Sequence, residues 1–268
     1  MDPTRVLSEM RSVGLHATEL GPDRYLPSEP RELEPLLASH ELSLIGAFVP
    51  LTLYRAELAS DMLSYCQRAS GTLASAGSSI MVLGPSSHLD GYDTPVTLSE
   101  EEWDLFFENL QRVVEINGED GLTTAVHPHW GMAVERPEHV DRLLDCSEAG
   151  LCLDTGHIYL GGGDPVTIAE QAGSRVVHVH LKDVDEEKAQ RVLAGEVPFR
   201  QAVIDDLFVP LGAGAVDIAG VIRHLESIGF DGWYVLEQDV SLKGEPAPGE
   251  GPIADAIASV EYLEGITL

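Results

Sequence analysis

The chain has 268 residues, 44% of them hydrophobic, which is enough for one large α/β domain with a sizeable core. Its 45 acidic residues outnumber the 16 basic ones and give a formal charge of −29, which argues against nucleic acids and anionic membranes as partners. The three cysteines are odd in number and follow no metal-binding spacing, which favours a reducing compartment, so we expect a cytoplasmic protein.

Stretches with a helical spacing of apolar residues alternate along the chain with short apolar runs typical of buried strands. This pattern predicts helices over residues 4–14, 30–40, 55–74, 99–118, 136–150, 164–174, 216–230 and 251–265. It predicts strands over residues 16–22, 42–51, 79–85, 122–131, 151–157, 176–183 and 232–239. A long excursion follows the sixth strand before the chain returns to this alternation.

Repeated strand and helix units with apolar strands indicate a parallel sheet covered by helices. The glycine fingerprint of an open dinucleotide-binding sheet is missing after the first strand, where the sequence is "GPDRYLP". Polar residues instead gather where successive strands end, which predicts an α/β fold of the TIM (β/α)8-barrel type. Because seven strands are predicted and the chain opens on a helix, we expect the first barrel strand to be lacking or shortened. No Pro/Gly/Ser-rich linker divides residues 1–268, which predicts a single domain.

Four consecutive predicted strands each end with an ionisable side chain on the inward face, because side chains two residues apart on a strand point the same way. These residues are His127, Asp154, His180 and Glu237. Neighbouring strands lie about 4.8 Å apart, so the four groups can converge on one point. Any one of them alone is readily explained as a cap or a structural hydrogen-bonding group. Two carboxylates and two imidazoles together form a ligand set for a divalent ion such as Zn²⁺, Mn²⁺, Co²⁺ or Fe²⁺.

Simpler interpretations apply to several neighbouring residues. His178 lies one layer deeper than His180 on the same predicted strand and is interpreted as a core histidine, and Cys152 as a small packed residue. The triple glycine at 161–163 lacks the lysine and the Ser or Thr of a phosphate-binding loop. It is therefore predicted to be a turn, with Asp164 capping the helix that follows.

The segments "LHATELGPDRYLP", "HPHWGMAVE", "LCLDTGHIYLGGGDP", "VVHVHLKDV" and "WYVLEQD" together resemble the sugar phosphate isomerase/epimerase superfamily of xylose-isomerase-like barrels. Within that superfamily, "HPH" and the opening segment are similar to the inosose dehydratase and inosose isomerase branch. The resemblance implies one divalent ion, with Mn²⁺ or Co²⁺ expected first and Mg²⁺, Zn²⁺ or Fe²⁺ as alternatives. Three ligands carry over directly, namely Asp154, His180 and Glu237. The fourth position, usually a glutamate, is held here by His127, with His129 as the alternative.

The resemblance also implies roles around the ion. Glu135 takes the place of a catalytic base, and His157, three residues after the ligand aspartate, that of a group that binds a substrate hydroxyl. Lys182 is expected to assist as an acid or oxyanion partner, the alternative being a salt bridge with a neighbouring acid such as Asp183. His129 and Glu19 are the expected substrate contacts.

The expected reaction begins with removal of a proton next to the carbonyl of a small polyhydroxy ketone, which gives an enediolate. The resemblance favours dehydration of 2-keto-myo-inositol, with isomerisation of an inosose or 3-epimerisation of a ketose as the alternative. An endonuclease acting at abasic DNA on the same barrel is disfavoured by the charge of −29, and a non-catalytic sugar-binding barrel is a third class. Association into a homo-oligomer is left open, and the hydrophobic segment 205–214 could cover this site or a neighbour's.

Overall fold

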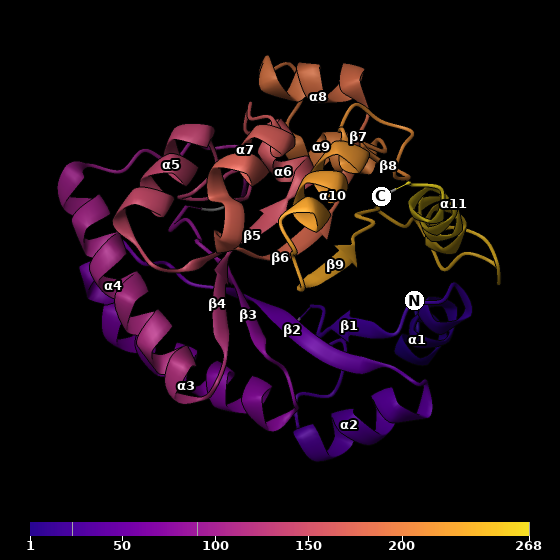
Figure 1. The fold of residues 1–268 in the computed structure, drawn as a ribbon, viewed down its shortest axis with the longest axis horizontal. Coiled ribbons are helices and arrows are strands. Elements are labelled where there is room, and N and C mark those ends of the chain that lie inside the picture. Colours follow the sequence, from indigo (N-terminus) through magenta and orange to yellow (C-terminus); the bar gives the residue numbers. More distant parts are fainter. Residues whose placement is uncertain (23, 90, 268) are drawn as a thin grey trace. The chain divides into compact units, whose positions relative to one another are not determined.

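A computed structural model describes residues 1–22, 24–89 and 91–267 (Figure 1). The contacts within the chain divide it into two compact units, each made of several segments. The first unit comprises residues 1–86, 97–126 and 146–150, and the second comprises residues 87–96, 127–145 and 151–268. Within the described residues, no helix combines the length and the apolar character needed to cross a membrane.

The first unit contains four parallel strands with helices beside them. The strands follow one another in chain order as β1 (Ala17–Glu19), β2 (Ser43–Pro50), β3 (Ile80–Gly84) and β4 (Thr123–Val126). Its helices are α1 (Pro3–Ser12), α2 (Pro30–Ser39), the 3-10 turn η1 (Ala56–Leu58), α3 (Ala59–Ser75) and α4 (Glu100–Glu119). Strand β3 is buried along its whole length, as expected for a parallel strand covered on both faces. Ser99 and Glu102 form a capping box at the start of α4, where three glutamates also favour the positive end of the helix dipole.

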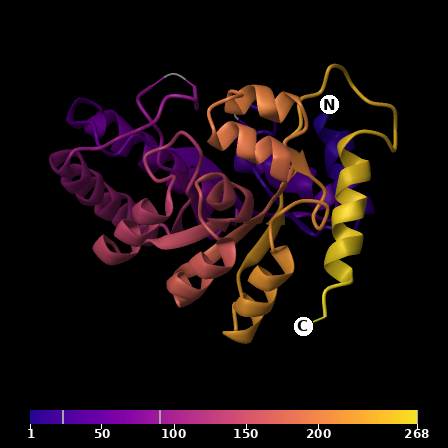
Figure 2. The same cartoon turned by 90° about the horizontal axis from the view of Figure 1, so that it is seen from above.

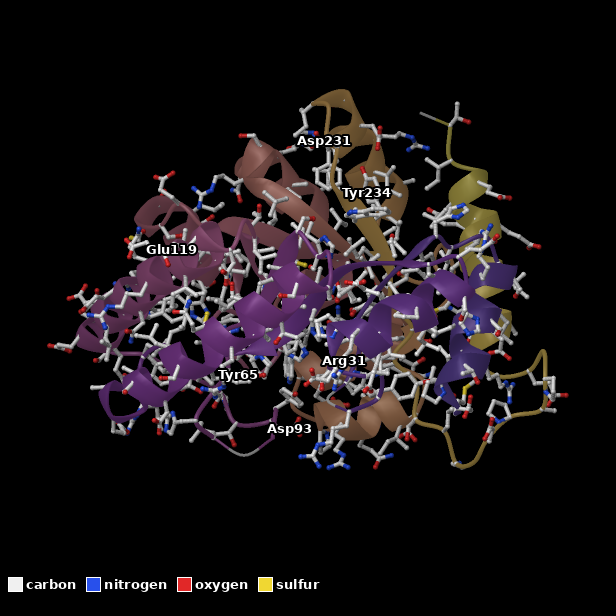
Figure 3. All side chains as sticks on the ribbon, turned by 90° about the horizontal axis from the view of Figure 1, so that it is seen from below. Arg31, Tyr65, Asp93, Glu119, Asp231 and Tyr234 are labelled. Carbon is white, nitrogen blue, oxygen red and sulfur yellow. The ribbon has the colours of Figure 1, made fainter. Side chains whose placement is uncertain are left out.

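The second unit contains three parallel strands in the order β5 (Gly150–Asp154), β6 (Val176–Leu181) and β9 (Trp233–Leu236). Its helices along the predicted alternation are α5 (Pro137–Cys146), α7 (Pro165–Ala172), α10 (Ile218–Ser227) and α11 (Pro252–Glu264), with the 3-10 turn η2 (Gly173–Arg175) after α7. Tyr234 of β9 donates a hydrogen bond to Glu226 of α10 at 3.0 Å, which ties this strand to its helix (Figure 3). All seven predicted strands are thus present.

The excursion between β6 and α10 has regular structure of its own. A two-residue antiparallel pair, β7 (Asp183–Val184) with β8 (Phe208–Val209), encloses the helices α8 (Glu186–Leu193) and α9 (Phe199–Ile204). Figure 2 shows these two helices lying beside each other. The fully buried carboxylate of Asp183 holds the chain that follows β8, because it accepts hydrogen bonds from the backbone N–H groups of Gly212, Gly214 and Val216 at 2.9 to 3.0 Å.

All seven predicted strands are shorter in the structure than in the sequence interpretation, and at three of them the difference changes the setting of a site residue. The prediction that residues 155–157 continue a strand was wrong, because Thr155 begins the short helix α6 (Thr155–Leu160). The side chain of Asp154 accepts the N–H of His157 at 2.7 Å and so caps this helix. Strand β4 ends at Val126, so His127 and His129 lie in a loop and not on a strand, and β9 ends at Leu236, just before Glu237.

Candidate metal centre

The second unit brings His127, Asp154, His180 and Glu237 together. One ligand atom from each lies within 4.8 Å of the others, and the first three side chains are buried. His127 Nε2 lies 3.1 Å from Asp154 Oδ2, and His180 Nδ1 lies 3.3 Å from Glu237 Oε1 and 3.9 Å from Asp154 Oδ2. These are the four residues expected from the strand ends. The geometry favours His127 over His129 as the fourth member, because the Nε2 atom of His127 lies beside the Asp154 carboxylate within this group.

Strand register places three of these side chains. Asp154, the last residue of β5, pairs in register with His180 of β6. Glu237 directly follows β9, and its backbone N–H donates to the carbonyl of Leu181 at 3.1 Å, which continues the pairing of β6 with β9. Parallel strands with matched ends therefore bring these groups to one point, as the sequence predicted.

The segment Asp-Thr-Gly-His at 154–157 has a separate task for each residue. Asp154 uses Oδ1 to accept the N–H of His157, which orients Oδ2 toward His127 and His180. Thr155 Oγ1 donates to the carbonyl of Lys182 at 2.7 Å and accepts its N–H at 2.8 Å. A Cβ at Gly156 would lie 2.9 Å from Lys182 Cγ, so this position requires glycine for the lysine side chain to pass.

Lys182 points into the centre of this group of acids. Its Nζ lies 2.7 Å from Glu237 Oε2, 3.0 Å from Asp239 Oδ2 and 3.4 Å from Asp154 Oδ2, and the side chain is almost fully buried. The salt bridge given as the alternative role of Lys182 is therefore present, but with these three acids and not with Asp183, whose carboxylate accepts backbone N–H groups.

The charges of Lys182 and of the neighbouring carboxylates stabilise one another. Burial alone would lower the pKa of Lys182, but the carboxylates of Asp154, Asp239 and Glu237 raise it well above its ordinary value. Burial would likewise raise the pKa of Asp154, but the charge of Lys182, with His157 and His127, holds it well below its ordinary value. The lysine is therefore an ammonium ion and Asp154 a carboxylate at neutral pH.

The rings of His157 and His129 contact each other beside this group, with centroids 3.8 Å apart and an angle of 32° between their planes. Burial holds the pKa of His157 well below its ordinary value and lowers that of His129 to about 3, so both rings are neutral. The N–H of Trp130 donates to His157 Nδ1 at 3.4 Å, so the ring hydrogen of His157 lies on Nε2. This buried Nε2 has no hydrogen-bond partner among the described residues. It is a donor available to a bound molecule.

Aromatic side chains from distant segments form a wall next to these histidines. Trp130 stacks on Phe199 with centroids 6.0 Å apart, and Phe208 lies 6.1 Å from the ring of His157. Lys182 Nζ lies 5.1 Å from the ring centroid of Phe208, so the hydrophobic segment 205–214 contacts the site of its own chain. Nε1 of Trp130 is buried and has no hydrogen-bond partner in the part of the chain that is described.

The sequence interpretation assigned no role in the site to Trp130, Phe199 or Asp239. Trp130 and Asp239 are close in sequence to expected site residues, and this proximity could have indicated a place in the site. No sequence pattern indicated Phe199, because it lies on α9, a helix that the sequence analysis did not predict within the excursion.

Glu135 and Glu19, two further predicted residues, lie outside the group of four. The Glu135 carboxylate accepts the N–H of Gly131 at 2.8 Å and lies 3.8 Å from Arg136 Nε. Burial raises its pKa, which suits a group that must accept a proton near neutral pH. Glu19 is the last residue of β1, in the first unit, and is half-buried. The substrate role of Glu19 stays a prediction.

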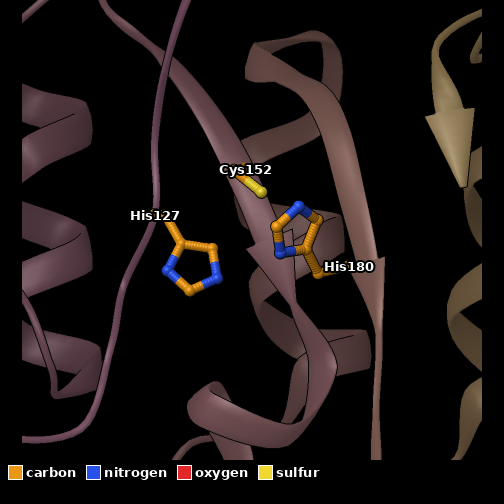
Figure 4. Close-up of side chains that lie close together, drawn as sticks. All are labelled: His127, Cys152 and His180. Carbon is orange, nitrogen blue, oxygen red and sulfur yellow. The ribbon is translucent and has the colours of Figure 1, made fainter. Parts of the chain in front are cut away.

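Cys152 lies closer to the group of four than its interpretation as a packing residue implied. It is fully buried in β5, and its Sγ and one nitrogen each of His127 and His180 lie within 4.8 Å of one another (Figure 4). His178 is fully buried as expected for a core histidine, with its ring centroid 5.3 Å from that of His180.

Comparison with known proteins shows to which family the chain belongs. A family model described as "Xylose isomerase-like TIM barrel" matches residues 7–263. The chain belongs to this family. It is 32% identical over 241 residues to the rhizopine catabolism protein MocC of Rhizobium meliloti, an alignment that covers 87% of this chain and 73% of the relative. It is 29% identical over 271 residues to inosose dehydratase of Geobacillus kaustophilus (strain HTA426), which covers 97% of this chain and 86% of that protein.

A solved structure shows the same fold at low sequence identity. The crystal structure of the IOLI protein with a bound zinc atom is 17% identical, with a TM-score of 0.72, and the match covers 98% of this chain and 94% of the other. The predicted fold class is confirmed: the described residues of this xylose isomerase-like TIM barrel form seven parallel strands, with a helix before the first of them. It is an enzyme of the isomerase or lyase type, as predicted.

Proposed function

We propose that this chain is a divalent-metal-dependent enzyme that forms an enediolate from a cyclitol or sugar ketone, and that it dehydrates 2-keto-myo-inositol. The observation that carries the proposal is the convergence of His127, Asp154, His180 and Glu237, with ligand atoms within 4.8 Å of one another. The relatives named inosose dehydratase support the substrate and the reaction.

The side chains fit a divalent ion. Two imidazoles and two carboxylates are ligands that Mn²⁺, Co²⁺, Zn²⁺ and Fe²⁺ accept, and the fully buried Asp154 carboxylate needs positive charge beside it. Mn²⁺ or Co²⁺ is our first choice, with Mg²⁺, Zn²⁺ or Fe²⁺ as alternatives, and the zinc atom bound in the IOLI structure supports metal binding by a protein of this fold. When bound, such an ion supplies Lewis acidity toward the carbonyl oxygen of the substrate.

The chain's own residues would then position the substrate and move its protons. The Nε2–H of His157 donates to a substrate oxygen, because it is buried and lacks a partner among the described residues. Glu135 accepts the proton from the carbon next to the carbonyl, as its raised pKa allows. Lys182 faces developing negative charge or gives a proton to the departing hydroxyl. The wall of Trp130 and Phe208 keeps water away.

The chemical balance of the dehydration is simple. A C–H bond next to the carbonyl breaks and its proton goes to the base, which leaves an enediolate. The enediolate then expels the hydroxyl of the next carbon, which takes up a proton and leaves as water. If the proton returns to carbon instead, the outcome is isomerisation or epimerisation, our second candidate, because the same residues serve the first step.

The test is incubation of the full-length protein with Mn²⁺ and 2-keto-myo-inositol in D₂O, with products followed by NMR. We expect loss of water from the substrate. Deuterium incorporation without water loss would contradict dehydration and favour the isomerase or epimerase. Metal binding is tested separately with Asp154→Asn, which should weaken Mn²⁺ binding at least about 100-fold, because loss of even an outer-shell group costs 10 to 100-fold. Asp164→Asn, which alters the cap of α7, is the matched control.

A further inference from the structure

Cys152 and Asp154 stand two residues apart on β5, so their side chains share one face of the strand, with the cysteine one layer deeper. Cys152 Sγ and one nitrogen each of His127 and His180 lie within 4.8 Å of one another. Figure 4 shows these three side chains close together. The same two histidines also belong to the group with Asp154 and Glu237. Two ligand sets therefore share two imidazoles and differ in whether sulfur or carboxylate oxygens complete them.

The two sets differ in chemical softness. Carboxylate oxygens suit hard ions such as Mn²⁺ and Mg²⁺, whereas a thiolate selects soft ions, and Zn²⁺ accepts both. A Zn²⁺ site made of three protein ligands commonly leaves a fourth position for water. Cys152 is fully buried, so water does not compete with its sulfur for a bound ion.

We propose that Cys152 gives this site a second coordination mode, in which His127, His180 and the Cys152 thiolate hold a thiophilic ion such as Zn²⁺ or Cd²⁺. The sulfur–metal bond forms as the thiol proton is released to solvent, and no electron is transferred. Because both modes need the same two histidines, they exclude each other. Cd²⁺ held in this mode thus displaces the ion of the proposed function and inhibits the enzyme; this consequence rests on that function.

The experiment uses the full-length protein, stripped of metal and titrated with Cd²⁺ while ultraviolet absorbance is recorded. Coordination of a thiolate to Cd²⁺ produces a charge-transfer band that carboxylate and imidazole ligands do not produce. We expect the band to saturate at one equivalent in the wild type and to be absent in Cys152→Ser and Cys152→Ala. Cys146→Ser, at the exposed cysteine, should keep the band.

Two further variants separate the modes. Asp154→Asn should keep the Cd²⁺ band while Mn²⁺ binding weakens at least about 100-fold, and Cys152→Ser should weaken Cd²⁺ binding by a similar factor. One equivalent of Cd²⁺ should also release bound Mn²⁺ from the wild type, which electron paramagnetic resonance of free Mn²⁺ measures. Circular dichroism of each variant reports whether it is folded, and the alanine variant provides a second test at this buried position.

A wild type without the band, or a band that persists in both Cys152 variants, would overturn the proposal. If Mn²⁺ binds through Asp154 and the band is absent, the thiolate mode fails while the proposed function stands. If the band appears and depends on Cys152 but the protein neither binds Mn²⁺ nor converts the ketone, the thiolate site stands and the proposed function fails.

Discussion

The ammonium nitrogen of Lys182 lies 2.7 Å from Oε2 of Glu237, inside a group of acids that also includes the fully buried carboxylate of Asp154. Buried carboxylates are stable only beside positive charge. Without a bound metal ion, this lysine is the cation that serves Asp154 and Glu237 together. In the mechanism we propose, the same ammonium group faces the negative charge that develops on the substrate.

We predict that Lys182→Met destabilises the metal-free protein by about 3–5 kcal/mol, because removing one partner leaves buried charge without compensation. Saturating Mn²⁺ should restore much of this loss, since a dication then balances the same carboxylates. Urea unfolding with EDTA and with Mn²⁺ measures both values. Lys188→Met, at a half-buried lysine that donates to the carbonyl of Asp206, is the control and should change stability by less than about 1 kcal/mol. Equal losses in the two variants would contradict the prediction.

Trp130 offers a test of the aromatic wall. Trp130→Phe keeps a ring to stack on Phe199 but removes the buried Nε1–H, which has no partner within the described chain. If this group donates to the substrate, kcat/KM should fall about 10-fold, the equivalent of one hydrogen bond of about 1.4 kcal/mol. Trp233→Phe, at an exposed tryptophan that begins β9, is the matched control. Steady-state kinetics of both variants tests this prediction. If Trp130→Phe has the kinetics of the wild type, the Nε1–H of Trp130 does not contribute to substrate binding.

Local pattern was sufficient to predict every parallel strand and the long helices, because the spacing of apolar residues, every two residues in a strand and every 3.6 in a helix, is a property of a short segment. It did not predict the short antiparallel pair β7 and β8. It also predicted Asp154 and His180, since the end of each apolar run marks the end of a strand. It predicted His127 for a partly wrong reason, because this residue lies in a loop beyond β4. The single-domain organisation and the cytoplasmic location stay predictions.

The features that sequence reasoning missed depend on contacts between distant segments. Helix α6 spans six residues and begins inside what looked like a strand, because the capping by Asp154 outweighs strand propensity there. Phe199 and Trp130 are 69 positions apart, so no local period relates them. Cys152 and Asp154 are two residues apart and share one face of β5. Only the positions of His127 and His180 indicate a role for the cysteine.

The carboxylate of Asp183 gives a prediction about the stability of the loop that follows β8. It accepts four backbone N–H groups, those of Val184, Gly212, Gly214 and Val216. Asp183→Asn replaces one accepting oxygen by a donor, so at least two N–H groups lose their acceptor at about 1–3 kcal/mol each. We expect a loss of about 3 kcal/mol in the free energy of unfolding, measured by urea titration.

The matched control for this prediction is Asp185→Asn, two residues further on, at the cap of α8. Asparagine caps helices nearly as well as aspartate, so this variant should change stability by well under 1 kcal/mol. A stable Asp183→Asn protein would show that the loop after β8 does not depend on that carboxylate.

Glu135 gives a prediction of pH dependence. Burial raises the pKa of this carboxyl above its ordinary value. A general base acts only when deprotonated, so activity should rise with pH through this raised pKa and be lost as the pH falls below it. Glu135→Gln should lower kcat by about 10²–10⁴-fold and flatten this acidic limb. Glu138→Gln, at an exposed neighbouring glutamate, should leave both rate and profile unchanged. A Glu135→Gln enzyme that keeps its rate and its acidic limb would assign the base to another residue, because the group that titrates would still be present.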